Sequence, residues 1–99
     1  MPYYIQKNVE RGSNMIEFSY KITDELGIHA RPAGILVKAA KEFESEITME
    51  KDNKSANMKM IFSLMGLGAK KDDMIKVIIN GSDEKTAKDK IETLIGEIL

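Results

Sequence analysis

The spacing of hydrophobic residues changes from every second residue to about every 3.6 residues within the segment IEFSYKITDELGIHARPAGILVKAAKEF, residues 16–43. Apolar and polar side chains alternate from Ile16 to Ile22, a pattern typical of a strand with one buried face. After a connection that contains Asp24 and Gly27, apolar residues recur at the spacing of one helical face. These residues are Ala33, Leu36, Val37, Ala40 and Phe43. The segment therefore predicts a strand, a connection and an amphipathic helix in this order.

The sequence after this helix predicts a hairpin and then a short helix. Residues 46–50 alternate in polarity, and the turn signal Asp52-Asn53 separates them from a third strand at residues 54–58. Residues 59–67 are apolar and contain few β-branched side chains, which favours a helix over a strand. We expect this helix to end at Gly66 and Gly68.

The C-terminal part predicts one more strand and one more helix. Residues 74–79 are rich in β-branched side chains, and a turn follows at residues 80–81. Ser82 or Asp83 can cap the last helix. Its apolar stripe consists of Ala87, Ile91, Leu94, Ile95 and Ile98. The predicted order is β-α-β-β-α-β-α, and these amphipathic elements indicate a two-layer α+β domain.

Residues 1–14 do not share this pattern and end in the turn-forming run Arg11-Gly12-Ser13-Asn14, directly before Met15. We interpret residues 1–14 as a mobile N-terminal extension, either native or introduced by cloning, and residues 15–99 as the domain. The alternative is an extra strand at residues 3–6.

Composition limits the classes of function. The 99 residues are 42% hydrophobic and carry a formal net charge of −1, which is unlike a basic nucleic-acid-binding protein. No cysteine is present, so disulfides and thiol nucleophiles are excluded, and the composition fits a reducing cytoplasm. No apolar run approaches the roughly 18 residues of a membrane span. With one histidine and scattered carboxylates, no metal site or cofactor is expected.

The one histidine, His29, lies just before the predicted first helix. Pro32 suits only the first turn of a helix, so the helix should start near Ala30, with His29 at or next to the N-cap. The first N–H groups of a helix lack partners and attract anions, and Arg31 adds a cation suited to phosphate oxygens. A neutral imidazole in this place can act as a nucleophile and form a phosphohistidine. Two alternatives stay open: an ordinary capping or surface histidine, and an anion site without chemistry.

The run GIHARPA, residues 27–33, resembles the phosphorylation-site motif of HPr. HPr is the histidine-containing phosphocarrier family of the bacterial phosphoenolpyruvate-dependent sugar phosphotransferase system. The resemblance covers roughly residues 15–99 and includes the element order and Asn57-Met58-Lys59 before the short apolar helix. It implies an open-faced β-sandwich, in which three helices cover one face of a four-stranded antiparallel sheet.

The resemblance also implies a function. Phosphorylated enzyme I would transfer its phosphoryl group to Nδ1 of His29, and sugar-specific acceptor domains of the phosphotransferase system would take it on. Arg31 would stabilise the charge, and Ala30 and Arg31 would bind the phosphate. The protein would be a cytoplasmic, monomeric carrier without a cofactor, and not a turnover enzyme by itself.

In the family a docking surface surrounds the histidine. The matching positions here are Gly34, Lys38, Lys41, Ile61, Phe62 and Met65. The segment 59–65 is apolar nearly all round, more than a short surface helix needs, so part of it can form an exposed patch for partners. The alternatives are that this helix is entirely core and that the two lysines form an ordinary solvated face.

Met60 matches the position at which many family members carry a regulatory serine. A thioether cannot accept phosphate, and Ser63, one turn later, is interpreted as structural. Serine-based regulation is therefore not predicted. Two other functions stay open: a regulatory binding module that carries no phosphoryl group, and a carrier in a nitrogen-related or dihydroxyacetone branch.

Overall fold

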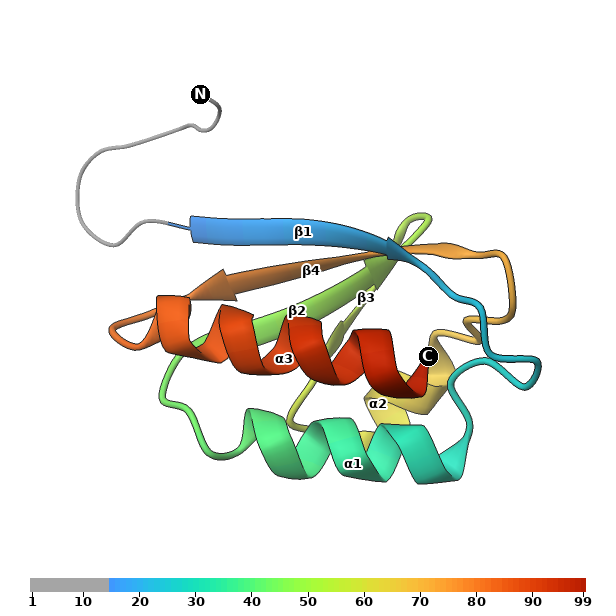
Figure 1. The fold of residues 1–99 in the computed structure, drawn as a ribbon, viewed down its shortest axis with the longest axis horizontal. Helices are drawn as coiled ribbons and strands as arrows, with labels where there is room; N and C mark the ends of the chain where they lie inside the picture. The colour runs from blue at the N-terminus through green and yellow to red at the C-terminus, as the bar shows by residue number, and fades with distance from the viewer. Residues whose placement is uncertain (1–14) are drawn as a thin grey trace.

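The computed structural model describes residues 15–99, and the expectations for residues 1–14, a mobile extension or an extra strand, lie outside this range. The described chain forms one antiparallel sheet, and its three helices lie together on one face of that sheet (Figure 1). The elements are β1 (Met15–Lys21), α1 (Ala30–Ala40), β2 (Glu46–Lys51), β3 (Lys54–Asn57), α2 (Ile61–Gly66), β4 (Met74–Asn80) and α3 (Glu84–Ile98). The predicted α+β open-faced sandwich is confirmed.

The strand order is β1-β4-β2-β3, so β4 lies inside the sheet and pairs with both β1 and β2. Val77 of β4 lies opposite Phe18 of β1 and Met49 of β2, and these three side chains contribute to the core beneath the helices. The neighbouring Lys76 is exposed and lies opposite Glu50 on the other face. The alternation of strand side chains thus separates one buried face from one polar face.

The core lies between the sheet and the helices. Residues of the predicted stripes of α1 and α3 are buried there: Ala33, Leu36, Val37, Ala40, Ala87, Ile91 and Ile95. Phe43 was expected to extend the stripe of α1, but the helix ends at Ala40 and Phe43 is only half-buried. No helix within residues 15–99 combines the length and the apolar character that crossing a bilayer requires.

The start of α3 is tied to the connection between α1 and β2. Asp83 is the N-cap residue, as predicted, but its carboxylate makes no capping hydrogen bond to α3. It accepts instead from the backbone N–H groups of Glu44 and Ser45, at 2.9 and 3.0 Å, and from the Ser45 hydroxyl. Glu84 accepts the Gly81 N–H at 2.9 Å. The expected local cap is therefore a tertiary link between distant segments.

This link predicts an acid sensitivity. The hydrogen bond from the Ser45 hydroxyl, followed by that from the Glu44 backbone N–H, lowers the pKa of Asp83 below its usual value of 3.8. The carboxylate therefore stabilises the fold above pH 3.8, and this contribution is lost as the pH falls through the lowered pKa. We expect Asp83→Asn to lower the free energy of urea unfolding at pH 7, and the difference from the unaltered chain to shrink below pH 3.8. Asp89→Asn, on the exposed side of α3, is the control, and a difference that does not change with pH would contradict the assignment.

Candidate functional site

His29 is placed by an abrupt change from loop to helix. It is the N-cap of α1, with extended backbone angles of φ −103° and ψ −170°. The first helical hydrogen bond runs from the Ala33 N–H to the His29 carbonyl at 3.0 Å. Pro32 is buried in the first turn, where its missing N–H leaves no acceptor unpaired. The predicted helix start at Ala30 and the N-cap position of His29 are confirmed.

The loop before His29 is held at both ends. On one side, the Ile28 N–H donates to the Ala69 carbonyl at 3.0 Å. Gly27 has a φ of +66°, and a Cβ there would lie 2.3 Å from the Ala69 carbonyl oxygen, so this close approach requires glycine. On the other side, the Thr23 N–H and its hydroxyl donate to the backbone oxygen of Leu99 at 2.6 and 3.0 Å. The loop therefore presents His29 in a defined place.

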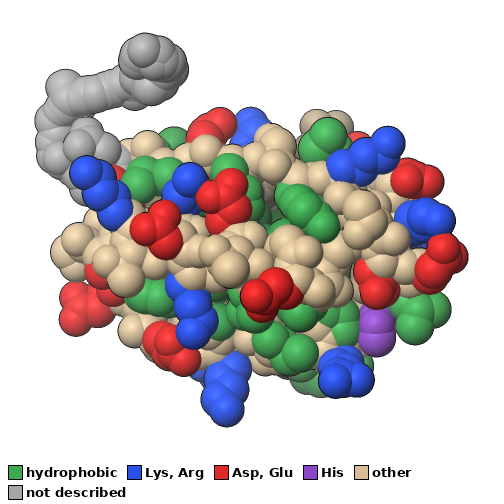
Figure 2. All heavy atoms as spheres, in the orientation of Figure 1, with side chains coloured by type: hydrophobic (Ala, Val, Ile, Leu, Met, Phe, Trp, Pro, Cys, Tyr) green, Lys and Arg blue, Asp and Glu red, His purple; other side chains and the backbone are tan. Residues whose placement is uncertain are grey.

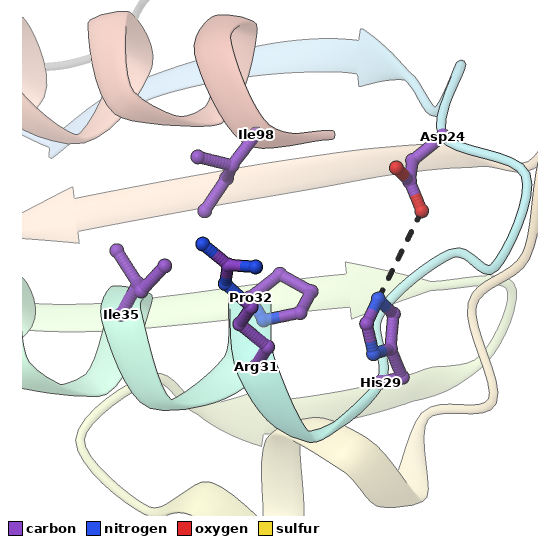
Figure 3. Close-up of a pocket in the computed structure, with 6 residues that line it drawn as sticks. All are labelled: Asp24, His29, Arg31, Pro32, Ile35 and Ile98. Carbon is purple, nitrogen blue, oxygen red and sulfur yellow. Dashed lines mark ion pairs between the residues drawn. The ribbon is translucent and has the colours of Figure 1, made fainter.

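His29 lies at a shallow surface hollow of about 280 Å³. The hollow is lined by Asp24, His29, Arg31, Pro32, Ile35 and Ile98 (Figure 3). The side chain of His29 is 41% exposed, and the imidazole is visible at one end of the molecule in Figure 2. A site this open and shallow suits reaction with a group that another protein carries better than deep binding of a small molecule.

Two features place positive charge at this hollow: the N-terminus of α1 and the Arg31 guanidinium. Ala30 and Arg31 supply the first N–H groups of α1, which lie ahead of its first hydrogen bond, at the positive end of the helix dipole. The Arg31 guanidinium makes no hydrogen bond or ion pair with any residue in the range 15–99. It lies toward Ile35 and Ile98 and not against the imidazole (Figure 3). The structure thus brings His29 and Arg31 to one hollow and leaves the guanidinium available for an anion.

Part of the short helix α2 faces solvent. Leu64 is fully buried, whereas Phe62 is 84% exposed, and Ile61 and Met65 are partly buried against the core. The interpretation of this helix as entirely core is therefore wrong. We call Ile61, Phe62 and Met65 the α2 patch. The patch adjoins α1, because a Cβ at Gly34 would lie 3.9 Å from Cδ1 of Ile61.

The two predicted docking lysines lie further along α1. Lys38 is exposed and follows Gly34 by one helical turn, on the same face. Lys41 is the C-cap of α1, about 18 Å from His29 at the rise of an α-helix. The structure does not bring Lys41 to the hollow. Met60, which matches the position of the family's regulatory serine, is the N-cap of α2, and Ser63 lies inside that helix.

The position of Gly34 within a helix predicts that an alanine there would stabilise the fold. It lies within α1, and an alanine Cβ would meet only Cδ1 of Ile61, at an ordinary contact distance of 3.9 Å. We expect Gly34→Ala to raise the free energy of urea unfolding by about 1 kcal/mol, because alanine is the better helix former. Gly27→Ala is the contrasting variant and should lose stability, because its Cβ collides with Ala69. A loss in Gly34→Ala would contradict this prediction.

Sequence reasoning missed three lining residues of the hollow. Asp24 appeared only as part of a connection, although its Oδ2 lies 4.0 Å from Nε2 of His29. Ile98 comes from the other end of the chain, and Ile35 lies outside the apolar stripe of α1. No periodicity links these positions to His29. Within residues 15–99, no group of three or more His, Cys, Asp or Glu side chains is placed to hold a metal ion.

Comparisons with known proteins identify relatives that share this fold. The family model described as "PTS HPr component phosphorylation site" matches residues 16–97. A histidine-containing phosphocarrier protein from Mycoplasma is 35% identical, covering 83% of this chain and 93% of its own, with a TM-score of 0.81. HPr from Thermoanaerobacter tengcongensis is 40% identical, covering 85% of this chain and 99% of its own, with a TM-score of 0.72.

A regulatory relative is similar as well. Crh of Bacillus subtilis, described as a catabolite repression protein and a domain-swapped dimer, is 31% identical. The match covers 95% of each chain, with a TM-score of 0.68. The family match spans most of the sequence and includes the loop and helix that carry His29. This chain therefore belongs to the HPr family of the phosphotransferase system.

Proposed function

We propose that this chain is a phosphoryl carrier. His29 accepts a phosphoryl group at Nδ1 from phosphorylated enzyme I and passes it to sugar-specific acceptor domains of the phosphotransferase system. The observation that carries this proposal is the position of His29, half-exposed at the N-cap of α1 in an open hollow that also holds a free guanidinium. Family membership supplies the donor and the acceptors.

The chemistry needs one nucleophile and compensation of negative charge. The lone pair of Nδ1 attacks phosphorus, an N–P bond forms, and the bond between phosphorus and the donor breaks. The N–H groups of Ala30 and Arg31 and the positive end of α1 then face the phosphoryl oxygens. The Arg31 guanidinium can turn to pair with the same oxygens. Because each group accepted is given away again, the chain is a carrier and not a turnover enzyme by itself.

The partner proteins complete the site in this proposal. The hollow is open, and the α2 patch beside α1 offers apolar surface to a partner, rimmed by Gly34 and Lys38. Lys38 and, further away, Lys41 favour approach of an acidic surface, which raises association rates more than affinity. The proposed carrier is a cytoplasmic monomer without a cofactor. Light scattering tests the monomer directly, since some relatives are described as dimers.

The experiment that tests the carrier function is intact-mass analysis. The chain is incubated with phosphoenolpyruvate, Mg²⁺ and a catalytic amount of a bacterial enzyme I. One added phosphoryl group that brief acid treatment removes is the expected result, because the N–P bond of phosphohistidine is acid-labile. A folded chain that takes no label from several enzymes I would overturn the proposal.

A second candidate function is a regulatory binding module. Its support is the likeness to Crh, a catabolite repression protein. The methionine at position 60 weakens this candidate, because a thioether at the N-cap of α2 cannot be phosphorylated. A pull-down comparing the phosphorylated and the unphosphorylated chain separates the two functions. Gene neighbours would separate sugar uptake from a nitrogen-related or dihydroxyacetone branch.

A further inference from the structure

A carboxylate faces the imidazole on the side away from the proposed site of attack. Oδ2 of Asp24 lies 4.0 Å from Nε2 of His29, and the two side chains point toward one another across the hollow (Figure 3). The charged side chains that line the hollow are Asp24 and Arg31, and Arg31 is turned toward Ile35 and Ile98. Nε2 therefore faces a negative charge, and Nδ1 lies on the other edge of the ring.

Asp24 is held in this position by several hydrogen bonds. Its backbone N–H donates to the backbone oxygen of Leu99 at 2.6 Å, and its carbonyl accepts the Gly27 N–H at 3.1 Å. Its carboxylate oxygen Oδ2, the one nearest the imidazole, accepts the Leu26 N–H at 3.0 Å. A side chain fixed at both its backbone and its carboxylate loses little entropy when it meets the ring. The carboxylate is thus preorganised for a second contact.

We propose that Asp24 is a positioning residue for phosphoryl transfer at His29, an inference that rests on the carrier function proposed above. Its carboxylate holds the proton on Nε2 and orients the ring, which leaves the lone pair on Nδ1 free for attack. A carboxylate that faces one imidazole nitrogen fixes the tautomer in the same way in other histidine sites.

The proton and the electron pairs balance in both directions. When Nδ1 attacks phosphorus, the electron pair of the broken bond leaves with the donor, and the Nε2 proton stays in place. The phosphorylated ring is then a cation that faces the Asp24 carboxylate. When an acceptor attacks phosphorus, the N–P electron pair returns to Nδ1, and the neutral ring with its Nε2 proton is restored. Asp24 stabilises the cationic ring between the two transfers.

Two substitutions separate this role from a purely structural one. Asp24→Asn keeps an oxygen that can accept the Leu26 N–H but removes the charge, whereas Asp24→Ala removes both. Glu25→Gln is the matched control, because Glu25 lies on the same loop and pairs with Lys71 at 2.8 Å, away from the imidazole. All variants carry the same histidine, so any difference arises from the loop.

The experiment measures single-turnover transfer from phosphorylated enzyme I by rapid quench. For Asp24→Asn and Asp24→Ala we expect the rate constant at saturating donor to fall by about tenfold. This loss is smaller than in an enclosed site, because the Asp24–His29 pair is partly exposed and its interaction is screened by solvent and salt. The donor concentration at half-maximal rate and the unfolding temperature of Asp24→Asn should not change. In the unphosphorylated chain, the ¹⁵N signals of the neutral imidazole should show the proton on Nε2, and Asp24→Asn should increase the share of the tautomer with the proton on Nδ1. Glu25→Gln should match the unaltered chain in every readout.

Three results would overturn the assignment. If Asp24→Asn transfers as fast as the unaltered chain and only Asp24→Ala is slow, the role of Asp24 is limited to accepting the Leu26 N–H in the turn. If Glu25→Gln slows transfer equally, the effect arises from the net charge of the loop and not from a specific contact between Asp24 and His29. If the unaltered chain takes no label at all, the carrier function itself fails, a result that is distinct from the other two.

Discussion

His29→Ala is expected to take up no acid-labile phosphoryl group, while the domain stays folded. No other imidazole is present in the sequence, so no second residue can form the acid-labile N–P bond of a phosphohistidine. The fold should tolerate the change, because the His29 side chain makes no capping hydrogen bond and is 41% exposed. Intact-mass analysis before and after brief acid treatment measures the label, and thermal unfolding measures the fold.

The control for this prediction is Ser63→Ala. Ser63 lies inside α2, and its substitution should leave the label unchanged. A serine phosphate survives the acid treatment that removes phosphoryl from histidine, so the two kinds of label are distinguishable by mass. Acid-labile label that persists in a folded His29→Ala chain would contradict the site assignment.

Phe62→Ala is expected to weaken docking strongly without destabilising the domain. The side chain is 84% exposed, so its removal costs little of the apolar burial that holds the fold together. An aromatic anchor buried in a complex commonly contributes more than 1.4 kcal/mol, so we expect a rise of about tenfold or more in the KM for transfer from enzyme I. Steady-state transfer with varied concentrations of the chain measures this KM.

Met74→Ala provides the matched control for Phe62. Met74 is also exposed, at 59%, but it lies on β4 and points to the open face of the sheet, away from the α2 patch. Its substitution removes apolar surface of the same kind and should leave the KM unchanged. Equal effects of the two substitutions, or no effect of either, would show that partners do not dock on the α2 patch.

Local sequence patterns predicted the order of all seven elements of the described chain. Periodicity indicated β1, α1, β2 and α3, a turn signal indicated β3, and the residue types indicated α2 and β4. The start of α1 was predicted closely, since Pro32 fits only a first turn and so restricts where the helix begins. The extent of that helix was less predictable. Phe43 continues the helical spacing, yet the helix ends before it, because spacing alone does not mark the last helical hydrogen bond.

The candidate site was predictable only in part. His29 and Arg31 could be found because they are close in sequence and their residue types suit phosphate. The roles of Asp24 and Asp83 were not predictable, because each depends on a partner brought near by folding. The Asp83 carboxylate binds residues nearly forty positions away, and Asp24 is positioned by Leu99 at the far end of the described chain.

Local sequence patterns were sufficient to predict the order of the elements, the buried face of the amphipathic strands and of α1 and α3, and the place of the histidine at a helix start. These properties follow from local periodicity and backbone stereochemistry, which act between near neighbours in the chain. Three other properties became known from the folded chain: which apolar side chain of α2 stays in solvent, which groups the Asp83 carboxylate binds, and which carboxylate faces the imidazole. Those outcomes depend on how the helices pack on the sheet and on loop contacts between distant segments, and such contacts leave no periodic signal.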